Sequence, residues 1–120
     1  MAKSIRTEKV SAEILKLLSQ ILREEVRDER VNSLFGSILD VEVTGDLRHA
    51  TVKVSVFGAD EEKAAFMEGL QSAKGFIRSE LGKRLRLRSV PELHFKLDLG
   101  IEEGSKMIAY IEQLKADGKF

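Results

Sequence analysis

The chain has 120 residues, of which 42% are hydrophobic and 33% are charged, and its 20 basic and 20 acidic side chains balance. The absence of cysteine excludes disulfides, thiolate metal sites and cysteine nucleophiles. No apolar run approaches the roughly 20 residues of a membrane-spanning helix, and the start lacks the apolar core of a signal peptide. We therefore expect one cytoplasmic domain over residues 1–120, frayed at 1–5 and 116–120.

Apolar residues at helical spacing predict a first helix over about residues 6–27. Two alternating segments around the turn Thr44-Gly45-Asp46 then predict a β-hairpin, and a third alternating segment follows Pro91. Each strand has one apolar side, so we expect a sheet that helices cover on one face only. The covered face should hold Leu39, Val41, Val43, Val52, Val54, Leu93, Phe95 and Leu97, with Glu42, Lys53 and Lys96 exposed opposite.

The segment between the hairpin and the third strand, residues 60–84, carries one continuous apolar helical stripe. Gly75 and Gly82 interrupt it, and each glycine costs ~1 kcal/mol relative to alanine inside a helix. Because the phase of the stripe continues through Gly75, we predict two helices that share a buried face and meet at a kink over Ala73–Gly75. A last helix is expected over about residues 101–115.

The predicted order is therefore α-β-β-α-kink-α-β-α, an α+β fold with a three-stranded mixed sheet covered on one face by helices. This is the arrangement of a type II KH-like domain. KH domains clamp single-stranded RNA with a GxxG loop between two helices. Here Ser72-Ala73-Lys74-Gly75 stands at that place.

Basic side chains dominate the run from Lys74 to Arg88, in which Glu80 is the only acidic residue. On a neutral chain, this segregation of charge favours a basic face that contacts RNA phosphates. The alternative is an ordinary solvated helix face. The candidate RNA-binding residues are Lys74, Arg78, Lys83, Arg84, Arg86 and Arg88. For Arg78 an ion pair with Glu80 or Glu68 is the competing role, and Lys83 and Arg84 could instead compensate the helix dipole.

Catalysis and metal binding find no support in the sequence. His49 and His94 have no recognisable partner, and no nucleophile–base pair, phosphate loop or ligand cluster is present. We therefore predict no enzyme, no cofactor and no metal site. A second hypothesis, from another class, is a small protein-interaction domain that docks through its acidic faces without direct RNA binding.

Two stretches, VEVTGDLRHATVKVSVFG and SAKGFIRSELGKRLRLRSVPELHFKLD, closely resemble the bacterial ribosome-binding factor A family, and the likeness extends from Arg6 to Leu114. Asp28-Glu29-Arg30 departs from the Asp-Pro-Arg that is frequent in the family. The resemblance implies a KH-like monomer that binds the small ribosomal subunit and its 16S RNA during late assembly. It also implies a role in 5′-end processing of that RNA and in growth in the cold, with no membrane and no small-molecule substrate.

Overall fold

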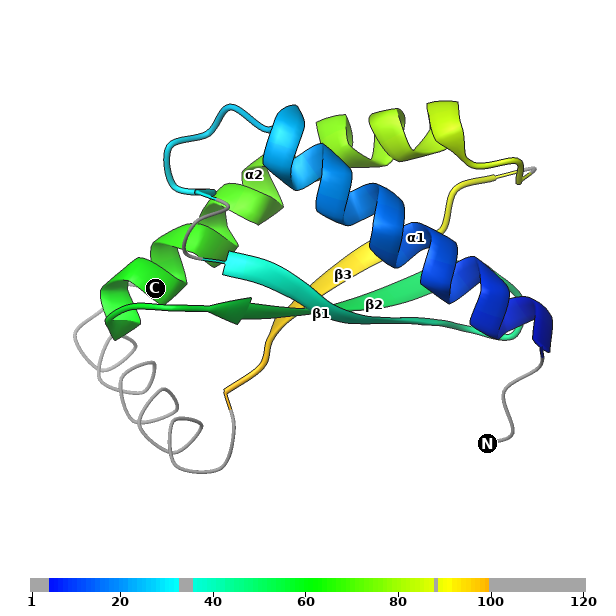
Figure 1. Ribbon diagram of the computed structural model, residues 1–120, viewed down its shortest axis with the longest axis horizontal. Helices are drawn as coiled ribbons and strands as arrows, with labels where there is room; N and C mark the ends of the chain where they lie inside the picture. The colour runs from blue at the N-terminus through cyan, green and yellow to red at the C-terminus, as the bar shows by residue number, and fades with distance from the viewer. Residues whose placement is uncertain (1–4, 33–35, 88, 100–120) are drawn as a thin grey trace.

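The computed structural model describes residues 5–32, 36–87 and 89–99. Both helices lie on the same side of the sheet (Figure 1), which confirms the predicted α+β class. The helix predicted over residues 101–115 lies outside the described residues. The elements are α1 (Ile5–Glu24), β1 (Gly36–Val43), β2 (His49–Val56), α2 (Asp60–Arg84) and β3 (Glu92–Leu97).

Helix α1 forms where the apolar stripe of the sequence predicts it. Its apolar side packs on the sheet and its other sides carry charged residues, as expected of a helix that covers one face of a sheet. Within the described ranges, no helix is both long enough and apolar enough to cross a bilayer. The buried residues of α1 are Thr7, Val10, Ile14, Leu18, Ile21 and Leu22.

The three strands lie in the order β1-β2-β3. Strand β2 pairs antiparallel with β1 and parallel with β3, so the sheet is mixed and β2 is its central strand. A parallel pair needs a crossover connection, and α2 supplies it (Figure 1). The predicted covered face is buried at Val41, Val43, Val52, Val54 and Leu93 and half-buried at Phe95 and Leu97, whereas Glu42, Lys53 and Lys96 are exposed as predicted.

The inward orientation predicted for Leu39 is wrong. Ile38 pairs with Val54 and Asp40 pairs with Lys53, so the ladder shifts register and leaves Leu39 as an extra residue. Such a β-bulge places two residues of one strand opposite one of the other and turns the extra side chain away. Leu39 is accordingly 49% exposed, and Ile38 occupies the inner side in its place.

Helix α2 is continuous over 25 residues, so the predicted division into two helices at Ala73–Gly75 is wrong. Buried residues on both sides of Gly75, among them Leu70 and Ile77, anchor the same face. Their burial outweighs the ~1 kcal/mol that one glycine costs a helix. The helix does change direction along its length (Figure 1). That the bend centres on Ala73–Gly75 remains a prediction.

Candidate nucleic-acid interface

The end of α2 and the segment that joins it to β3 carry the predicted basic residues. At the end of the helix, Leu85 turns into extended backbone while its N–H still donates to the carbonyl of Leu81. Leu85 is buried, Arg86 is exposed and Leu87 is half-buried. The alternation seen in the sequence therefore anchors this segment through its leucines and directs Arg86 to solvent. Arg88 lies outside the described residues.

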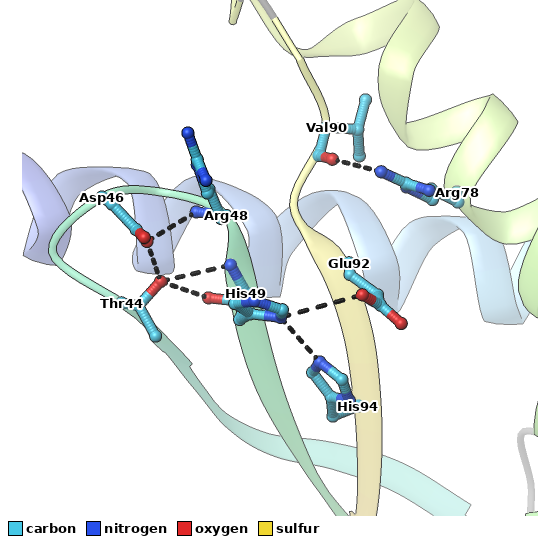
Figure 2. A network of polar contacts seen from close by, with 8 residues as sticks. All are labelled: Thr44, Asp46, Arg48, His49, Arg78, Val90, Glu92 and His94. Carbon is cyan, nitrogen blue, oxygen red and sulfur yellow. Dashed lines mark hydrogen bonds and ion pairs between the residues drawn. The ribbon is translucent and has the colours of Figure 1, made fainter.

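Arg78 reaches from α2 to the segment before β3. Its Nη2 donates to the carbonyl oxygen of Val90 at 2.8 Å (Figure 2). The competing ion pairs with Glu80 or Glu68 are not formed, since those carboxylates bind other cations. This hydrogen bond holds the segment before β3 against α2. A guanidinium has five N–H donors, so the exposed Arg78 still has N–H groups that can donate to a partner.

Lys83 and Arg84 are engaged in ion pairs. The Nζ of Lys83 lies 3.0 Å from Oε1 of Glu80, and the Nη2 of Arg84 lies 3.9 Å from the other oxygen of that carboxylate. Arg84 also bonds Glu25 directly after α1, an acidic partner far away in the sequence. These contacts tie the ends of the two helices together, so the charges of Lys83 and Arg84 are largely balanced.

Lys74 and Arg86 form no ion pair with any described residue. Lys74 lies one helical turn before Arg78, on the same side of α2, and Arg86 belongs to the segment that Arg78 holds. We call these three residues, Lys74, Arg78 and Arg86, the cationic surface. They remain available to an anionic partner.

The two glycines of α2 differ in their surroundings. A Cβ built on Gly82 would lie 2.9 Å from Cγ2 of Val90, so Gly82 allows the helix to pack against the segment before β3. A Cβ on Gly75 would meet nothing within 4 Å. Gly75 is exposed, and its neighbour Phe76 is 46% exposed. Packing within the described residues therefore gives no reason for glycine at position 75.

We expect Gly75→Ala to stabilise the protein by roughly 0.5–1 kcal/mol, because alanine restricts the unfolded chain and finds open space in the helix. Gly82→Ala should raise the free energy of unfolding by less than Gly75→Ala, or lower it, since its new methyl group displaces Val90. Urea unfolding curves of both variants measure the difference. A clear loss of stability in Gly75→Ala would instead show that the bend of α2 needs glycine at this position.

The connection after α1 carries an ion pair that the sequence did not indicate. Arg30 binds Asp28 through two side-chain hydrogen bonds, Nε to Oδ1 at 3.0 Å and Nη2 to Oδ2 at 2.7 Å. Its Nη1 lies 3.2 Å from Oε1 of Glu68 on α2. The guanidinium of Arg30, together with its backbone N–H, lowers the pKa of Asp28 to about 2.

The lowered pKa of Asp28 has a consequence for acid unfolding. A carboxylate whose pKa is lower in the folded state contributes stability above its unfolded pKa of 3.8, and loses it as the pH falls toward 2. We expect Asp28→Asn to be less stable than the parent at pH 5, with the difference shrinking between pH 4 and pH 2. Urea unfolding at pH 5, 3 and 2 measures this. If the parent and Asp28→Asn differed in stability by the same amount at all three pH values, the lowered pKa of Asp28 would be contradicted.

The sequence analysis also missed a cluster on the face of the sheet opposite the helices. His49 at the start of β2 lies beside Glu92 and His94 of β3 (Figure 2). The sequence shows no recognisable partner for either histidine, and the parallel register of β2 and β3 brings the two together. No local motif could have revealed this pairing.

A mixed three-stranded sheet with the described helices on one side defines a small α+β protein, and its cationic surface is a candidate site for an anionic partner. The family model for ribosome-binding factor A matches residues 6–111. Ribosome-binding factor A of Synechococcus sp. (strain CC9311) is 47% identical over 117 residues, which cover 98% of this chain and 87% of that protein. The chain belongs to the ribosome-binding factor A family.

Solved structures share the fold. The solution NMR structure of a Thermotoga maritima protein is 40% identical, has a TM-score of 0.73, and is matched over 85% of this chain and 95% of that one. A homology model of Thermus thermophilus ribosome-binding factor A, fitted into a cryo-EM map of its complex with the 30S subunit, is 22% identical. It has a TM-score of 0.57, over 72% of this chain and 88% of that one, and supports the fold alone.

Proposed function

We propose that this protein binds the small ribosomal subunit during late assembly through phosphates of the 16S RNA. The observation that carries the proposal is the cationic surface, whose side chains are not neutralised by described acidic residues although the whole chain has a net charge of zero. Arg78 on α2 and Arg86 just after it are exposed, and Lys74 on α2 is half-buried. Guanidinium and ammonium groups held in this way are suited to phosphate contacts. Arg88, which the sequence analysis also predicts as an RNA-binding residue, lies outside the described residues and stays part of the proposal as a prediction.

Two further arguments support this function. Membership of the family relates the chain to ribosome-binding factors. Gly75 leaves open space beside Lys74, which permits an RNA backbone to approach α2 closely. Lys83 and Arg84 remain candidates, but they must exchange their ion pairs with Glu80 and Glu25 for phosphates. Roles in 5′-end processing and in growth in the cold are part of the same proposal.

Binding driven by phosphate contacts must weaken as salt is added, because each contact releases condensed counterions. If three or four side chains engage a single strand, the slope of log affinity against log salt concentration should be roughly −2 to −3. Co-sedimentation with purified small subunits, and filter binding to 16S RNA, at several salt concentrations measure this slope. Binding to subunits that does not change with salt would favour the alternative, an interaction with ribosomal proteins through the acidic faces.

A further inference from the structure

The cluster of His49, Glu92 and His94 lies on the face of the sheet opposite the helices. His49 and Glu92 are register partners on the parallel strands β2 and β3. His94 follows Glu92 by two residues and therefore points to the same side. The Nδ1 atom of His49 lies 3.0 Å from Nε2 of His94 and 3.8 Å from Oε2 of Glu92. The three potential ligand atoms all lie within 4.8 Å of one another.

These separations match the requirements of a small divalent ion. With ligand bonds of about 2.0–2.1 Å in a tetrahedral site, neighbouring ligand atoms are about 3.3–3.4 Å apart. The observed 3.0 and 3.8 Å bracket that value, and the third pair of ligand atoms lies within 4.8 Å, so side-chain rotations are needed to bring all three atoms to one ion. The two imidazole nitrogens face each other and need one shared proton in the absence of an ion. A metal replaces that proton and binds both lone pairs.

The backbone around the cluster is held firmly (Figure 2). The N–H of His49 donates to Oγ1 of Thr44 at 3.2 Å, and the N–H of Thr44 donates to the carbonyl of His49 at 2.9 Å. The hydroxyl of Thr44 in turn donates to Asp46 at 2.6 Å. The N–H of Glu92 donates to the carbonyl of Arg48 at 2.8 Å. Ligands from the two strands are thus positioned before any ion binds, which lowers the cost of binding.

We infer that His49, Glu92 and His94 form a site for a divalent ion of the zinc class, with the remaining coordination positions open to water. Two imidazoles and one carboxylate suit Zn²⁺, Ni²⁺ or Cu²⁺, whereas Mg²⁺ and Ca²⁺ require oxygen ligands. The bound ion links β2 to β3 at the residue where the segment carrying Arg86 enters the sheet. The ion therefore stabilises the start of β3, a role separate from RNA binding.

Calorimetric titration of the chelator-treated protein with Zn²⁺ alone tests the site. We expect one ion per chain and no comparable binding of Mg²⁺. His49→Gln, Glu92→Gln and His94→Gln should each weaken Zn²⁺ binding by more than about tenfold, because even the loss of an outer hydrogen-bond partner of a metal ligand costs about 10–100-fold. The matched control is Glu61→Gln, an exposed carboxylate on the first turn of α2, which should bind Zn²⁺ like the parent.

A second measurement uses the unmodified protein, so it does not depend on the folding of a variant. Nitrogen-15 NMR of the two imidazoles should show the Nδ1 of His49 and the Nε2 of His94 shifting together as one equivalent of Zn²⁺ is added. Zn²⁺ should also raise the Tm, because an ion that binds only the folded state stabilises it. Absence of Zn²⁺ binding, or binding by His49→Gln and His94→Gln as tight as that of the parent, overturns the proposal and leaves a hydrogen-bonded histidine pair.

Discussion

Reversing two charges of the cationic surface, Lys74→Glu together with Arg86→Glu, should lower the affinity for small subunits by roughly a hundredfold or more. Hydrogen bonds to charged groups contribute about 1.5–3 kcal/mol each, and every 1.4 kcal/mol corresponds to tenfold in affinity. The salt slope should also fall in magnitude by roughly 1–2, because two phosphate contacts are lost. Co-sedimentation at several salt concentrations measures both effects.

The matched control for this variant reverses two cations on the other face of the sheet, Lys53→Glu with Lys96→Glu. Both lysines are exposed and are partners across β2 and β3, so the net charge changes equally. Lys53, Lys96 and Arg86 are exposed, and Lys74 is half-buried without an ion pair to a described residue, so neither variant should change the free energy of unfolding much. Equal loss of binding by both variants would indicate a general charge effect. Retention of binding by the Lys74 and Arg86 variant would refute the role of the cationic surface in binding the small subunit.

The fold could be predicted from the sequence wherever one element alone determines the pattern. The alternation of apolar and polar residues correctly predicted the inner faces of β2 and most of β1. The helical spacing of apolar residues correctly predicted α1 and the extent of α2. Leu39 was misplaced because a β-bulge depends on how two strands pair. The helix break at Gly75 was predicted from local propensity, which burial of Leu70 and Ile77 overrides. The more specific relation to KH domains remains a prediction.

The candidate site was predictable in part for the same reason. The run of basic residues is local in the sequence, so Lys74, Arg78 and Arg86 could be named. The sequence could not show which of the basic residues are neutralised, because Glu25, which binds Arg84, lies directly after α1 and is 59 residues away in the sequence. The pairing of His49 with His94 depends on the parallel register of β2 and β3. Single-sequence patterns carry no information on that register.

The largest effect on stability is expected for Phe66→Ala. Phe66 is 2% exposed and is among the largest fully buried side chains of the core between α2 and the sheet. Truncating a buried phenylalanine to alanine removes its transfer free energy and leaves a cavity, with a loss of about 3–5 kcal/mol. Because a domain of this size has about 5–15 kcal/mol of stability in total, the variant should unfold at a much lower urea concentration than the parent.

The chain provides its own controls for this measurement. Phe57 follows β2 and is 83% exposed, so Phe57→Ala should change the free energy of unfolding by less than about 0.5 kcal/mol. Phe95 on β3 is half-buried, so the loss in free energy of unfolding for Phe95→Ala should lie between the losses for Phe57→Ala and Phe66→Ala. Where Phe66→Ala leaves no folded protein to measure, Phe66→Leu retains most of the volume and should cost less than half as much. Similar losses for Phe57 and Phe66 would mean that exposed fraction does not rank these rings, and that the packing of α2 on the sheet is misassigned.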